Sequence, residues 1–63
     1  MKHLDAEQAV IGAILRDNTV LYRLGDLSAE HFFLDDHKII FSEISALIRS
    51  GKTADTITVS DRL

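Results

Sequence analysis

The chain has 63 residues, a net charge of −3 and no cysteine. A chain of this length forms one domain and buries only about 60% of the surface that its unfolded form exposes, so we expect marginal stability. The lack of cysteine excludes disulfides and thiolate metal sites, and it agrees with a reducing, cytoplasmic setting. No apolar run approaches the roughly 20 residues that span a membrane. The mildly acidic charge argues against direct binding of nucleic acid, which requires clustered Lys and Arg.

Residues 4–18 predict an amphipathic helix after a flexible lead-in over residues 1–3. Asp5 suits the N-cap, and Gln8 stands where its capping-box partner belongs. Apolar residues recur at the spacing of one helix face, with Glu7, Gln8 and Arg16 outside it. This face comprises Ala6, Val10, Ala13 and Ile14, widened by Ile11 and Leu15.

Gly12 lies in the middle of this helix. A glycine there weakens the helix by up to about 1 kcal/mol relative to alanine. Its small size would let another backbone approach closely, and we expect residues 36–50 to supply that neighbour.

Asn18 can cap a second helix over residues 19–24, and Gly25 can end it in the left-handed region. Ser28 is then the N-cap of a single helical turn. We expect this turn to deliver both Phe32 and Phe33 into the core, as two large anchors for a small protein.

The third and longest predicted helix covers residues 35–50, with Asp35 and Asp36 in its first turn and Gly51 at its end. Its inward stripe consists of Ile40, Ile44, Leu47 and Ile48, with Phe41 beside them. Replacing Phe41 with alanine should cost about 3–5 kcal/mol of stability if the ring is buried. A fourth helix is expected from Thr58, with Asp61 at its capping-box position.

These elements predict an all-α fold, a small orthogonal bundle of three to four short helices without a sheet, in a single domain over residues 1–63. The residues expected to pack the core are Val10, Gly12, Ile14, Phe32, Phe33, Ile40, Phe41, Ile44 and Leu47.

Candidate chemical groups are few, and helix capping accounts for most of them. His31, Asp35, Asp36 and His37 are suitable metal-ligand types, but their spacing fits no recurring metal site. Paired carboxylates such as Asp35 and Asp36 start helices, and Ser42 lies five residues from His37, which is poor helical geometry for contact. We therefore expect no catalytic residue, no metal and no cofactor.

Four side chains are candidates for a partner interface: Tyr22, Arg16, Arg23 and Arg49. Arginine and tyrosine are enriched among interface hot spots, although each residue singly fits an ordinary solvated face. Phe32, Phe33 and Phe41 could also form a stacking platform for single-stranded nucleic acid, but no basic groove accompanies them, so core packing is favoured.

The order of motifs resembles the N-terminal domain of hexameric DnaB-type replicative DNA helicases. Residues 6–15 read AEQAVIGAIL, which is similar to the family's AEQ-(A/S)-V-L-G-(A/G)-(I/L)-(L/M). Residues 37–44 read HKIIFSEI, similar to H-x-x-I-F-x-x-(I/M), and residues 55–59 read DTITV, similar to D-(L/x)-(I/V)-T-(L/V). The pair at residues 32–33 matches the family's D-F-(Y/F) position, whereas residues 20–27 match less closely.

The resemblance implies the first part of a helical bundle that serves as a protein-interaction collar. It implies helicase subunits, a primase or a helicase loader as partners, and a homo-oligomer as the assembly. The sequence has no G-x-x-x-x-G-K-(S/T) phosphate loop, so we expect neither ATP hydrolysis nor unwinding by this chain alone.

Two alternatives remain at the level of sequence. The chain could be a complete small phage or prophage protein that mimics this domain and regulates the host helicase or primase. It could also be a DNA-binding module, which would show salt-sensitive binding to DNA.

Overall fold

The computed structural model describes residues 3–63 and, within that range, contains helices and no strand. The elements are α1 (Leu4–Arg16), α2 (Val20–Arg23), a 3-10 turn η1 (Ala29–His31), α3 (Asp35–Arg49) and α4 (Thr56–Arg62). The predicted all-α fold is confirmed for the described residues. Of the predicted lead-in, residues 1–2 lie outside the described part, and His3 is the N-cap of α1. No helix among residues 3–63 is both long and apolar enough to cross a membrane.

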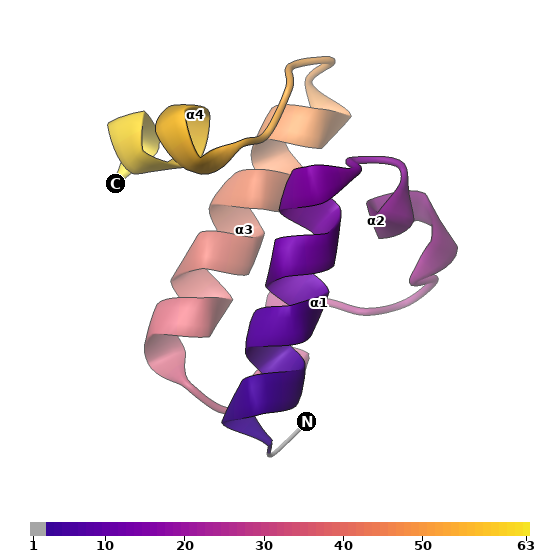
Figure 1. The fold of residues 1–63 in the computed structure, drawn as a ribbon, viewed down its shortest axis with the longest axis vertical. Coiled ribbons are helices and arrows are strands. Elements are labelled where there is room, and N and C mark those ends of the chain that lie inside the picture. The colour runs from indigo at the N-terminus through magenta and orange to yellow at the C-terminus, as the bar shows by residue number, and fades with distance from the viewer. Residues whose placement is uncertain (1–2) are drawn as a thin grey trace.

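α1 and α3 form the centre of the fold and run side by side in the same direction (Figure 1). α2 lies beside the C-terminal end of α1, and the chain then returns to the other end of the molecule before α3 begins. α4 crosses the far end of α3 at a steep angle (Figure 1). We call the end of the domain where α1 and α3 both start the foot, and the end where α4 is attached the head. Different contacts hold these two ends.

The core lies between these helices and is centred on a pair of aromatic rings. Phe32 and Phe41 are buried, and their ring centroids are 5.0 Å apart. The other buried apolar residues are Ile11, Ile14, Leu21, Ile44, Leu47, Ile48, Ala54 and Val59. Val10 and Ile40, two of the expected core residues, are partly buried and pack against this cluster.

Phe33 is 63% exposed, so the prediction that it enters the core is wrong. Phe32 follows η1 in an extended conformation, with φ −81° and ψ 143°. Successive side chains of an extended segment point to opposite sides. Because Phe32 points inward, Phe33 points outward.

The buried face of α1 is rotated relative to the sequence expectation. Its buried positions are Glu7, Ile11 and Ile14, while Ala6 is exposed. The N-cap also lies earlier in the chain than predicted, because it is His3, and Asp5 lies in the first turn. Asp5 is therefore not the N-cap, although its charge still suits the positive end of the helix dipole.

Gly12 does not admit the backbone of α3, so that prediction is wrong. A Cβ atom built on Gly12 would meet Arg16 Nη1 of the same helix at 3.4 Å, and no atom of another segment lies within 4 Å of it. The side chain of Arg16 thus folds back along α1 over the glycine. The close contacts between α1 and α3 lie elsewhere.

The C-terminal end of α3 and the N-terminal end of α4 are both capped by residues close in sequence. Gly51 has a φ of +83°, and the amides of Gly51 and Lys52 donate to Ile48 O and Leu47 O, which is the Schellman pattern. Asp55, not Thr58, caps α4: its Oδ1 accepts from Thr58 N at 2.8 Å, and Thr58 Oγ1 accepts from Asp55 N at 2.9 Å. The prediction that α4 begins at Thr58 is wrong because Thr58 is the returning partner of this capping box.

The adjacent phenylalanines provide a matched test of the core. Phe32→Ala should lower the free energy of unfolding by about 3–5 kcal/mol, because a fully buried ring leaves a cavity. Phe33→Ala makes the same chemical change on an exposed side chain and should shift it by less than about 0.5 kcal/mol. Urea titration followed by circular dichroism measures both. Equal losses for the two variants would contradict the inward and outward placement.

Candidate interaction surface and the polar contacts behind it

Glu7 is fully buried, and it joins α1 to the segment that leads into α3. Its Oε2 accepts a hydrogen bond from Phe33 N at 2.6 Å, and its Oε1 accepts one from Leu34 N at 3.4 Å. His37 Nδ1 lies 2.7 Å from Oε1. An ionised carboxylate only accepts hydrogen bonds, so His37 carries a proton on Nδ1 in this contact. The carboxylate thus gathers three donors from a segment about 30 residues along the chain.

Two opposing effects act on the pKa of Glu7. Burial raises the pKa, because it disfavours the charged form. The hydrogen bonds from Phe33 N, His37 and Leu34 N, together with the charge of His37, lower it. The hydrogen bonds outweigh burial, so the pKa lies below its ordinary value of 4.5. Glu7 therefore stays ionised in the folded protein, where its donors need a negative acceptor.

Asn18 forms the corresponding contact at the head of the domain. Its Nδ2 donates to Ile14 O and to Ala54 O, both at 2.8 Å, and its Oδ1 accepts from Ala54 N at 2.9 Å. The side chain therefore closes the last turn of α1 and fixes the segment before α4. The prediction that Asn18 caps α2 is wrong, because the residue before α2 is Thr19 and the Asn18 amide is used elsewhere.

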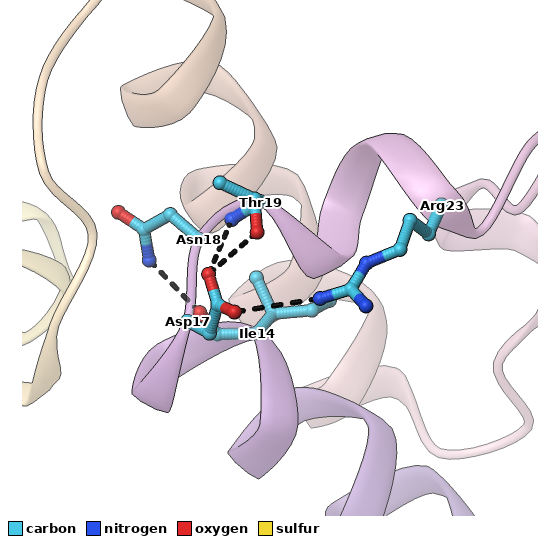
Figure 2. Close-up of polar contacts among 5 residues, drawn as sticks. All are labelled: Ile14, Asp17, Asn18, Thr19 and Arg23. Carbon is cyan, nitrogen blue, oxygen red and sulfur yellow. Dashed lines mark hydrogen bonds and ion pairs between the residues drawn. The ribbon is translucent and has the colours of Figure 1, made fainter.

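The turn between α1 and α2 is instead organised by Asp17, as Figure 2 shows. Asp17 Oδ1 accepts from Thr19 Oγ1 at 2.6 Å and from Thr19 N at 3.0 Å, and Oδ2 lies 3.4 Å from Arg23 Nη2. The hydroxyl of Thr19, then its amide, and then the charge of Arg23 lower the pKa of Asp17. This is an Asx-type turn on the surface, where the Arg23 ion pair adds little stability.

Several large apolar side chains remain exposed around this framework. They are Leu4, Tyr22, Phe33, Leu34, Ile39, Ile57 and Leu63. Phe33 and Leu34 are adjacent, and Glu7 holds both of their backbone amides. We name residues 33 and 34 the apolar tip. Because its backbone is fixed from inside the protein, the tip presents its side chains without the freedom of an ordinary loop.

Two open grooves accompany the exposed side chains. The first has a volume of about 440 Å³ and lies between residues 27–29 and the C-terminal half of α3, which contributes Phe41, Ser42, Ser45, Ala46 and Arg49. We name it the α3 groove. The second, of about 340 Å³, is lined by Asp36, Ile39, Ile40 and Leu63. Both are mostly apolar, but the first carries a basic residue at its edge and the second an acidic one.

The four predicted interface residues lie on two parts of the surface. Tyr22 is 62% exposed on α2, next to Arg23, and Arg16 ends α1 nearby. Arg49 is separate: its Nε donates to Ser45 Oγ at 3.1 Å at the edge of the α3 groove. Their role in an interface remains a prediction.

The candidate chemical groups are dispersed by the fold. His37 contacts Glu7, His31 Nδ1 accepts from Ser28 N at 3.0 Å, and Lys38 Nζ lies 3.6 Å from Asp35 Oδ1. Within residues 3–63 no three His, Asp or Glu side chains are grouped so that they could hold a metal ion. Asp35 and Asp36 lie in the first turn of α3 as predicted, but neither is its N-cap, which is Leu34. His37 belongs to the buried contact.

Sequence reasoning missed the long-range hydrogen bonds of Glu7, His37 and Asn18. The inward placement of Glu7 and Asn18 could have been inferred from helix spacing, because positions 7 and 18 share one helix face with Ile11 and Ile14. Their hydrogen-bond partners could not have been inferred, since these contacts join residues 26 to 36 positions apart.

The fold and its surface define a small helical domain with exposed apolar side chains. Residues 1–63 match the family described as the DnaB-like helicase N terminal domain. The chain belongs to this family.

Curated relatives agree with this assignment. The chain is 39% identical over 61 residues to the replicative DNA helicase DnaB of Pasteurella multocida, and 36% identical over 61 residues to that of Buchnera aphidicola subsp. Schizaphis graminum. It is 37% identical over 62 residues to the protein from Rickettsia conorii. These matches cover 95–97% of the chain but only 13% of each relative. No solved structure gave a significant match to the chain.

The pH dependence of stability tests the Glu7 contact. Glu7 has a lowered pKa in the folded state, so its ionised form stabilises the fold above pH 4.5, and this contribution is lost as the pH falls through the folded-state pKa. Glu7→Gln should be less stable than the natural chain at pH 7, because glutamine keeps only one acceptor oxygen and its NH2 group would face at least one of the three donors. The two stabilities should converge below pH 4.5.

Urea titrations from pH 3 to pH 7 measure this difference, and Glu30→Gln is the control for loss of one negative charge from an exposed side chain. A Glu7→Gln deficit that stays constant across the range would show that ionisation of Glu7 does not hold the foot of the domain.

Asn18→Ala tests the contact at the head. The N–H and C=O groups of Ala54 would lose their partners in a buried position, so the free energy of unfolding should fall by about 1–3 kcal/mol. Arg23→Ala breaks the exposed ion pair nearby and should cost less than about 1 kcal/mol. Thermal or urea unfolding compares them, and the reverse order would refute the assignment.

Proposed function

We propose that this chain is the first part of the N-terminal helical bundle of a replicative DNA helicase, and that it acts by protein–protein contact in DNA replication. In this proposal it supports ring assembly and contacts primase or a helicase loader, in the cytoplasm. Its contribution is binding and not ATP hydrolysis, because the sequence carries no phosphate-binding loop.

The observation that supports this proposal most strongly is the apolar tip. Exposed aromatic side chains are enriched at protein interfaces, and a fixed backbone reduces the entropy lost on binding. Phe33 combines both features, since it is 63% exposed while its amide is bonded to the buried Glu7. Family membership supplies the setting, because the matching relatives are named replicative DNA helicases.

The charge of the surface supports a protein partner over a nucleic acid. Acidic residues outnumber basic ones by ten to seven. Three of the basic side chains, Arg23, Lys38 and Arg62, are already paired with Asp17, Asp35 and Glu43. A nucleic-acid surface needs a cluster of cations that face the phosphates.

A chimera tests the proposal. The segment of Pasteurella multocida DnaB that matches this chain would be replaced by residues 1–63, and assembly would be measured by mass photometry beside a deletion of that segment. We expect the chimera to assemble and to bind its primase as the parent does, and the deletion to lose both. Phe32→Ala in the chimera is the control, because it should unfold the graft and reproduce the deletion.

A chimera whose graft resists proteolysis, and is therefore folded, but which neither assembles nor binds primase, would contradict the proposed function. Binding of the 63-residue chain to DNA that weakens steeply with salt would favour the nucleic-acid alternative instead.

A further inference from the structure

The apolar tip and the α3 groove are complementary in both chemistry and charge. The tip consists of Phe33 and Leu34 and is followed directly by Asp35 and Asp36, whose side chains are exposed. The α3 groove is mostly apolar and carries Arg49 at its edge. We propose that the tip of one copy of this chain docks in the α3 groove of a second copy, in a head-to-tail contact. This inference rests on the proposed function, because it names the contact through which copies would assemble.

The groove has space for a side chain of the tip. It is open to solvent and has a volume of about 440 Å³. Three of the α3 residues that line it, Ser42, Ser45 and Ala46, are small and leave room for an entering ring. Phe33 is the side chain that would enter, with Leu34 beside it.

The charges select this groove over the other one. An acidic residue, Asp36, lines the second groove and would repel the aspartates that accompany the tip. Arg49 at the edge of the α3 groove would attract them. Lys38 pairs with Asp35 at 3.6 Å, but the Asp35 side chain is still 91% exposed, so the tip keeps an acidic flank.

The contact must be intermolecular, and it joins two different surfaces of the chain. Phe33 precedes α3 while Arg49 is its last residue, and the 15 residues of α3 span roughly 20 Å. Phe33 is exposed and therefore does not occupy the groove of its own molecule. Because tip and groove are different surfaces, each copy can donate one and accept one, and such heterologous contacts generate rings or filaments.

Complementation between two defective chains tests the inference. Phe33→Ser removes the tip and leaves the groove, whereas Ala46→Glu fills the groove with an acidic side chain and leaves the tip. Each variant alone should associate at least about 30-fold more weakly than the natural chain, the effect of losing a hot-spot contact. Mixed together, they should form a 1:1 heterodimer, because the groove of one can accept the tip of the other.

Sedimentation equilibrium measures the association constants, and native mass spectrometry identifies the heterodimer by the different masses of the two chains. Tyr22→Ser is the matched control, since it removes an equally exposed aromatic ring outside both surfaces and should associate like the natural chain. Arg49→Glu gives an independent test that leaves the tip unchanged, and it too should weaken association.

The inference is overturned if the natural chain stays monomeric at millimolar concentration. It is also overturned if folded Phe33→Ser associates as tightly as Tyr22→Ser, or if the mixture yields no heterodimer. These outcomes leave the chimera experiment untouched. If the chimera assembles but Phe33→Ser does not weaken association, only the tip contact is refuted. If Phe33→Ser weakens association but a folded chimera neither assembles nor binds primase, only the proposed function is refuted.

Discussion

The buried carboxylate of Glu7 is the constraint on which the foot of this domain depends. It replaces a capping side chain for α3, whose N-cap residue, Leu34, has no side-chain hydrogen bond of its own. It accepts from the amide of Leu34, the N-cap, which is one of the donors that the start of a helix leaves unpaired, and from the amide of Phe33 just before it. The contact from His37 then ties the first turn of α3 to the same carboxylate. A buried charge is tolerated here because every one of these donors points at it.

This arrangement explains how one short segment serves the core and the surface together. With the backbone at residues 33–34 held by Glu7, Phe32 is directed against Phe41 and Phe33 is directed outward. At the opposite end of α1, Asn18 fixes the segment before α4 by hydrogen bonds to both backbone groups of Ala54. The inner face of α1 thus has apolar residues in its middle and one polar side chain at each end. Those polar ends set where α3 and α4 begin relative to α1.

The sequence predicted what depends on neighbours in the chain. Gly25 and Gly51 adopt the expected positive φ values, and the apolar stripe of α3 is buried around Ile44. Glu7, His37 and Phe33 escaped prediction, because their environment is fixed by residues far away in sequence. A pattern of apolar residues assigns a glutamate to the surface by default. The three donors that bind Glu7 lie 26 to 30 residues further along the chain, so its neighbours in sequence do not indicate them. Gly12 was misjudged for a related reason, since its neighbour is the side chain of Arg16 on the same helix.

Amide hydrogen exchange at Phe33, followed by NMR at pH 7, tests the central claim most directly. Phe33 lies outside any helix and its side chain is exposed, so without the Glu7 contact its amide should exchange as fast as that of an unstructured residue. If the buried carboxylate holds this segment, the Phe33 amide should be protected as strongly as the buried amides of α1 and α3. Glu7→Ala, which removes both acceptor oxygens, should abolish that protection. Rapid exchange at Phe33 in the natural chain, beside protected helices, would contradict the account.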